Sequence, residues 1–117
     1  MSFDGVEKSM TNRPIYSIYV VELGASALDD PKFDHPHRDR DKPCLYVGST
    51  AKAIEERYDD HQVGSWTQSR AAQKHGVKRL RPDLAQGKYA YSRDKAVEIE
   101  ARLADTLRSQ GYGVSQH

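Results

Sequence analysis

Glu100 is the first candidate for a functional residue, because it falls among apolar residues of a predicted helix. The segment 92–110 has the spacing of an amphipathic helix, and its apolar stripe is formed by Ala96, Val97, Leu103, Ala104 and Leu107. Glu100 lies three or four residues from the first four of these, so a helix turns its side chain into the apolar face. A carboxylate in that position is costly unless it is paired, hydrogen-bonded or bound to a metal. On the pattern alone, a structural ion pair and a functional site are equally good interpretations.

Arg57 and His61 form a second candidate pair. They lie four residues apart in a helix expected over about 50–63, so they share one helical face. Ala53 and Ile54 precede them by one turn, which places this face at the border of the core. A surface Arg–His pair is commoner than an active site, so the pair gains weight only in combination with other residues.

Two tyrosines lie in the apolar runs that predict the first strands. Tyr19 belongs to the run 15–23, which is rich in β-branched and aromatic residues and is apolar on both faces. Tyr46 belongs to the run 44–48, where alternate residues point to opposite faces. Ordinary packing is the favoured interpretation for either tyrosine taken singly.

The segment 70–81 is the one locally basic stretch of the chain. It follows Trp66 and has only Asp83 as an acidic neighbour in the sequence; its cations are Arg70, Lys74, Lys78, Arg79 and Arg81. Clustered cations beside an aromatic residue suit phosphate contact and base stacking. A solvated helix and loop is the alternative, and the charge balance of the remaining chain favours function.

Other reactive side chains give weaker signals. His35 and His37 lie in a long charged loop at 25–42, but a third fixed metal ligand is not evident, and a solvated loop is the better interpretation. A loop of this length in a compact domain is usually functional or mobile. Cys44 reads as a small strand hydrophobe.

The composition limits the classes of protein to consider. The chain has 117 residues, 37% of them apolar and 30% charged, which fits one globular domain. A net charge of +1 means that any nucleic acid would be met by a local patch. One cysteine excludes an intrachain disulfide and fits a cytoplasmic setting. The absence of an apolar run of about 20 residues argues against a membrane span.

The predicted organisation is a flexible tail over 1–13 and a single domain over 14–117. After the two strands, helices are expected over about 50–63 and 69–75, with a turn at 82–87 and a short third strand at 88–91. The last helix begins at Ser92 or Asp94 and ends near 110, where Gly111 suits a C-terminal cap. This order predicts an α+β fold with a small antiparallel sheet of about three strands, flanked by helices.

Taken in order, these residues resemble the GIY-YIG nuclease family. Ser17-Ile18-Tyr19 resembles the family's first half-motif, and Tyr46-Val47-Gly48 resembles the second. Arg57 and His61 follow in the family's order. The helical stretch 96–103 resembles the family's metal-binding helix, whose glutamate falls on Glu100. The tail Gly111-Tyr112-Gly113-Val114 resembles the segment after that helix, so the resemblance spans about 15–114.

The chain departs from the family pattern at three places. Ser17 replaces the glycine of the first half-motif, and Gly113 stands where the family often has asparagine. The segment between Tyr19 and Tyr46 is more than twice the usual length, which places an insertion at about 25–42.

The resemblance implies DNA phosphodiester hydrolysis with one divalent metal, Mg²⁺ or Mn²⁺, held by Glu100. Arg57 would bind the scissile phosphate and stabilise its transition-state charge. Tyr19 or Tyr46 would orient or deprotonate the attacking water, and His61 is the competing base. The implied partner is DNA, and cutting both strands would need a homodimer or two successive events.

Two other functions fit the sequence. The domain could bind nucleic acid through the basic segment 70–81 without cleaving it. It could also be a protein-interaction domain that uses the loop 25–42, in which case it has no salt-dependent affinity for DNA.

Overall fold

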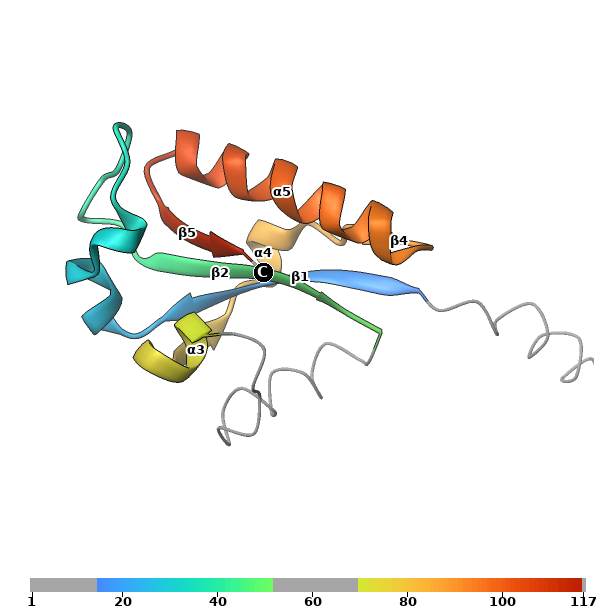
Figure 1. Ribbon diagram of the computed structural model, residues 1–117, viewed down its shortest axis with the longest axis horizontal. Coiled ribbons are helices and arrows are strands. Elements are labelled where there is room, and N and C mark those ends of the chain that lie inside the picture. Colours follow the sequence, from blue (N-terminus) through green and yellow to red (C-terminus); the bar gives the residue numbers. More distant parts are fainter. Residues whose placement is uncertain (1–14, 52–69, 117) are drawn as a thin grey trace, which may run out of the picture.

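The computed structural model describes residues 15–51 and 70–116, which form an α+β unit with a five-stranded sheet (Figure 1). One long helix, α5, crosses one face of the sheet. Two short 3₁₀ helices and α3 lie on the opposite side. The α+β class expected from the sequence is therefore confirmed.

The centre of the sheet is an antiparallel pair of strands. β1 spans Tyr16–Leu23 and pairs with β2, which spans Cys44–Thr50. In this register Tyr19 lies opposite Gly48 and Val21 lies opposite Tyr46. Both strands were expected, although β2 continues through Ser49 and Thr50, where the sequence predicted the start of a helix.

β4 (Tyr89–Ala90) confirms the short third strand predicted at 88–91, whereas β3 (Val77–Leu80) and β5 (Gly113–Gln116) correct the prediction of an antiparallel sheet of about three strands. β3 and β4 pair with the outer edge of β1, and β5 runs parallel to β2. β3 and β5 are four residues long, too short for a clear alternation pattern. β5 is parallel because α5 carries the chain back along the sheet before β5 begins.

The helices match the sequence expectation where they are described. α3 spans Arg70–His75 and is followed by Gly76 in a left-handed conformation. α4 (Pro82–Ala85) occupies the predicted turn. α5 spans Arg93–Ser109, with Ser92 accepting a capping bond from the Lys95 amide at 3.2 Å. None of the described helices is long and apolar enough to cross a membrane.

Apolar side chains fill both faces of the sheet. The α5 side contains Ile18, Val20, Leu45 and Val47 packed against Ala96, Leu103, Ala104 and Leu107. The opposite side contains Tyr19, Val21, Cys44 and Tyr46 packed against Ala27, Phe33 and Ala71. β1 is thus the doubly covered strand that its sequence predicts. Val97 departs from the expected stripe, because it lies at the stripe's border and is 42% exposed.

The loop 25–42 is folded against the sheet around one arginine. It contains the 3₁₀ helices η1 (Ala25–Asp29) and η2 (Pro31–Phe33). The side chain of Arg38 is only 4% exposed; it donates to the Phe33 carbonyl at 3.1 Å and to Cys44 Sγ at 3.3 Å. A buried guanidinium whose two terminal nitrogens bond to backbone and strand acceptors fixes the loop more firmly than a solvated ion pair can.

Arg38→Ala is therefore expected to lower the free energy of unfolding by about 2–4 kcal/mol, because it empties a buried site and removes the donors that bind the loop. The matched control is Arg40→Ala, since the Arg40 side chain is 55% exposed and should cost less than about 1 kcal/mol. Urea unfolding of both variants makes the comparison. Equal losses would show that Arg38 does not organise the loop.

Candidate functional site

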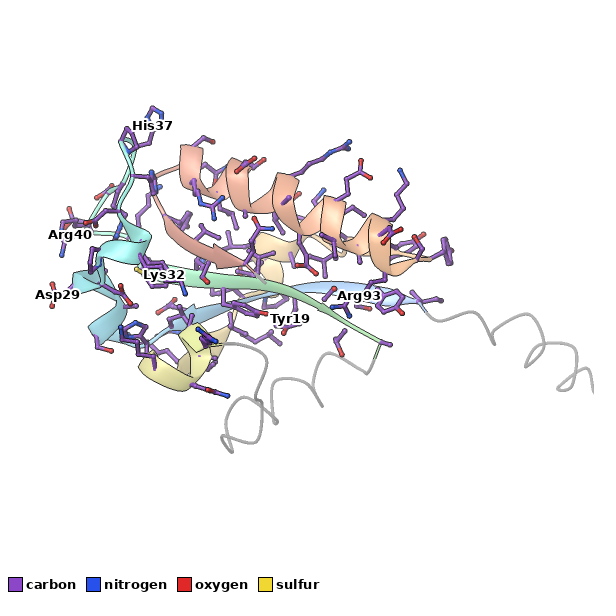
Figure 2. The ribbon with its side chains drawn as sticks, viewed as in Figure 1. Tyr19, Asp29, Lys32, His37, Arg40 and Arg93 are labelled. Atoms are coloured by element: carbon purple, nitrogen blue, oxygen red, sulfur yellow. The ribbon has the colours of Figure 1, made fainter. Side chains whose placement is uncertain are left out.

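The two strand tyrosines lie together on the side of the sheet away from α5. Their ring centroids are 6.1 Å apart with an interplanar angle of 50°. Figure 2 shows Tyr19 on this side of the sheet. Both side chains are buried, with 2% of each residue exposed. The structure therefore brings together the tyrosines of the two half-motifs, which are far apart in the sequence.

Gly48 has a structural reason to be glycine. A Cβ atom at this position would lie 2.7 Å from the Tyr19 hydroxyl oxygen and 2.9 Å from Tyr46 Cε2. Such contacts are well inside van der Waals distance, so a larger residue would displace one or both rings. Tyr19 thus packs directly over the β2 backbone, and the segment Tyr46-Val47-Gly48 forms one packed unit with it.

Glu100 occupies the position that its helical spacing predicts. It is 3% exposed within the apolar face of α5. Ser49 Oγ donates a hydrogen bond to Glu100 Oε2 at 2.5 Å, joining β2 to α5 across 51 residues of sequence. This bond gives the buried carboxyl group a polar partner from another element.

The glutamate and the tyrosines approach β2 from opposite faces. Side chains alternate along a strand, so Ser49 faces α5 whereas Gly48 faces the tyrosines. The carboxylate of Glu100 and the hydroxyl of Tyr19 therefore meet neighbouring residues of β2, one on each side. Sequence reasoning missed Ser49 as a partner of the glutamate, although its place directly after the second half-motif was a usable signal.

Three of the predicted site residues lie outside the described part of the chain. Arg57, His61 and Trp66 fall within 52–69. Their predicted roles in phosphate binding, proton transfer and base stacking remain predictions.

The basic segment 70–81 meets carboxylates that its sequence neighbourhood does not reveal. Lys74 Nζ lies 3.3 Å from Asp30 Oδ2. Glu22, 7% exposed on β1, lies within 4 Å of the cationic groups of Lys78, Arg79 and Arg81. Asp83 also pairs with Arg81, and these bonds hold the pKa of Asp83 below its ordinary value. The patch is therefore less positive than the sequence alone indicates.

The weaker candidates have structural roles. His35 Nε2 lies 2.7 Å from the Tyr112 carbonyl, and its Nδ1 accepts from the His37 amide at 3.2 Å. Figure 2 shows His37 at the tip of its loop, away from the tyrosines. Burial raises the pKa of the Cys44 thiol, which makes it a poor nucleophile. Among residues 15–51 and 70–116, no three His, Cys, Asp or Glu side chains gather as metal ligands.

A hydrogen-bonded chain that the sequence did not predict joins the loop to α3. Ser26 Oγ lies 2.7 Å from His75 Nδ1, and His75 Nε2 lies 2.9 Å from Asp30 Oδ2. The bond from His75, with help from the Lys32 amide, lowers the pKa of Asp30 from 3.8 to about 2. The carboxylate therefore stabilises the fold in its ionised form.

No family model matches this chain, and neither a curated protein nor a solved structure matches it.

Asp30→Asn is expected to destabilise the protein at neutral pH. Because the folded-state pKa of Asp30 is depressed, its contribution is fully present above pH 3.8 and is lost as the pH falls through about 2. The difference in unfolding free energy between variant and natural chain should accordingly shrink across this interval in urea titrations. Asp29→Asn, whose side chain is 88% exposed, is the control. A difference that is constant with pH would contradict the assignment.

Proposed function

We propose that this protein is a metal-dependent DNA endonuclease of the GIY-YIG type, cleaving phosphodiester bonds with one divalent metal. The observation that supports this most directly is the Ser49–Glu100 hydrogen bond. It holds the one carboxylate of the apolar helix face against the residue that follows Tyr46-Val47-Gly48. Two motif segments separated by half the chain are thereby adjacent at β2, with the carboxylate on one face of the strand and the tyrosine rings on the other.

The packing of the first half-motif on the second is the next support. Tyr19 lies over Gly48 and beside Tyr46, so the two half-motifs form one structural unit. The two tyrosine-bearing segments are therefore joined as the resemblance implies.

The metal suggested by this function fits the chemistry of Glu100. Its carboxylate is a hard oxygen donor, and Mg²⁺ commonly takes one or two carboxylates and completes its shell with water and phosphate oxygens. When bound, such an ion neutralises charge on the phosphate oxygens. Glu100 would be the protein ligand, with Mn²⁺ as an acceptable substitute for Mg²⁺.

The other residues would act on the phosphate and on the attacking water. Arg57 would bind the scissile phosphate and stabilise its added transition-state charge. Tyr19, Tyr46 or His61 would accept the proton of the water. A tyrosine ordinarily titrates near pH ~10, so it needs a lowered pKa for this role, whereas a histidine does not.

The burial of the site sets a requirement on the reaction. Tyr19 and Tyr46 are 2% exposed and Glu100 is 3% exposed, which is too little for direct contact with a phosphodiester. Cleavage therefore requires a conformation in which these groups are more open than in the structure described here. Opening and closing of loops over a site is a common step in enzyme turnover.

Glu100→Gln is expected to lower Mg²⁺-dependent nicking of supercoiled plasmid by at least about 100-fold, because the metal ligand is lost. The amide oxygen can still accept from Ser49, so the fold should be retained. Glu98→Gln is the matched control, since Glu98 lies on the same helix, is partly exposed and pairs with Lys95 and Arg102. Full nicking activity in Glu100→Gln would exclude the proposed metal site.

DNA binding and cleavage by the unsubstituted protein distinguish the nuclease from the two competing functions. Salt-dependent DNA binding without cleavage in Mg²⁺ or Mn²⁺ would replace the nuclease with a non-catalytic nucleic-acid-binding domain. The complete absence of salt-dependent DNA affinity would favour a protein-interaction domain instead.

Arg57→Ala is expected to reduce the single-turnover cleavage rate by about 100-fold or more while weakening DNA affinity less than about tenfold. The reason is that transition-state charge exceeds ground-state charge at the phosphate. Cleavage rates are measured at saturating protein, and affinities are measured in Ca²⁺. Equal losses in rate and affinity would mean that Arg57 only anchors the DNA backbone.

A further inference from the structure

A hollow opens at the outer edge of β1, next to Tyr19. β4 pairs with this edge at Tyr16 and Ser17, and β3 pairs with it from Val21 onward. Between these strands the edge is bridged by the bonds Ile18 N–Lys88 O (3.0 Å) and Arg81 N–Val20 O (2.8 Å). The resulting cavity has a volume of about 380 Å³, within the range of ~300–1,000 Å³ typical of small-ligand sites.

Exposed aromatic rings border this hollow. Tyr89 is 54% exposed and Tyr91 is 56% exposed, and their rings meet edge to face with centroids 5.6 Å apart. Together with Ile15, they account for three of the four large hydrophobic residues that are exposed in the described chain. Such clustering of exposed apolar groups at one hollow marks a binding site rather than random surface.

The charge around the hollow is positive. Lys88 lines it, and none of its described lining residues is acidic. An adjoining hollow shares Tyr89 and Tyr91 and is bordered by Lys95. Arg93 begins α5 at this end of the sheet (Figure 2), so the segment 88–95 carries three cations and one carboxylate, Asp94, while Lys95 also pairs with Glu98 at 3.3 Å.

These properties fit a ligand that combines a flat apolar surface with an anionic backbone. Tyrosine rings provide stacking surfaces that accept any base, and lysine or arginine side chains neutralise the phosphates that follow. A base-paired duplex has no free base to place in the hollow, so the partner must contain unpaired nucleotides.

We propose that this hollow binds an unpaired nucleobase stacked on the ring of Tyr91, with Tyr89 standing edge to face beside that ring. Because Ser17 and Tyr19 form part of its lining, the base would lie beside the first half-motif. If the proposed nuclease function holds, the preferred substrate is DNA with unpaired nucleotides next to the scissile bond, such as a flap, a bubble or a single strand. The binding itself does not depend on catalysis.

The experiment uses the full chain carrying Glu100→Gln, so that the DNA is not cut. Fluorescence anisotropy measures its affinity for an oligothymidylate of roughly 10 nucleotides and for a duplex of equal length. Adding Tyr91→Ala should weaken oligothymidylate binding by about 5- to 100-fold and leave duplex binding nearly unchanged. Tyr91→Phe, which keeps the ring, should bind within about twofold of its parent.

Val97→Ala is the matched control, because Val97 is similarly exposed but does not line either hollow. It should leave both affinities unchanged. Oligothymidylate affinity that survives Tyr91→Ala, or falls equally in Tyr91→Phe, would overturn stacking at this site. Equal losses for oligothymidylate and duplex would overturn the preference for unpaired bases.

Failure of the proposed base-binding hollow and failure of the proposed nuclease function give different results. Plasmid nicking that depends on Glu100, together with no ring-dependent binding of oligothymidylate, would retain the nuclease and overturn this site. Ring-dependent oligothymidylate binding in a chain that cleaves no DNA would retain this site and exclude the nuclease.

Discussion

The burial of a carboxylate in the apolar face of α5 is the constraint on which the arrangement depends. Glu100 cannot remain in that face without a polar partner, and Ser49 at the end of β2 provides one. Satisfying this bond fixes both the rotation of α5 and its position along β2. The helix then delivers the chain to β5 in the direction that makes it parallel to β2. One polar contact thus links the motif residues to the topology of the sheet.

The opposite face of the sheet is organised by close packing of a different kind. Tyr19 needs a glycine beneath it, and Gly48 meets that need at the residue before Ser49. The contacts of the two faces therefore fall on adjacent positions of one strand. The carboxylate and the tyrosine rings are accordingly buried on opposite sides of the sheet.

Polar residues that stand alone in the sequence are mostly partnered in the fold. Arg38 holds the loop 25–42, the Ser26–His75–Asp30 chain ties that loop to α3, and Glu22 offsets much of the basic segment. The loop accordingly covers the tyrosine side of the sheet as a structural layer. The exposed aromatic rings lie instead at Tyr89 and Tyr91, beyond the segment that the charge pattern favoured.

Sequence periodicity alone was sufficient for the α+β class, the doubly covered β1, the capped α5 and the inward orientation of Glu100. Each of these follows from local spacing, because a helical or strand repeat decides which side chains share a face. The strands β3 and β5, the partner of Glu100 and the neutralisation of the basic segment depended on contacts between residues far apart in the chain. A four-residue strand has no periodicity of its own, and a carboxylate finds its partner only when another element is packed against it. The tertiary structure alone therefore decided that Ser49 meets Glu100 and that Tyr19 and Glu100 reach β2 from opposite sides.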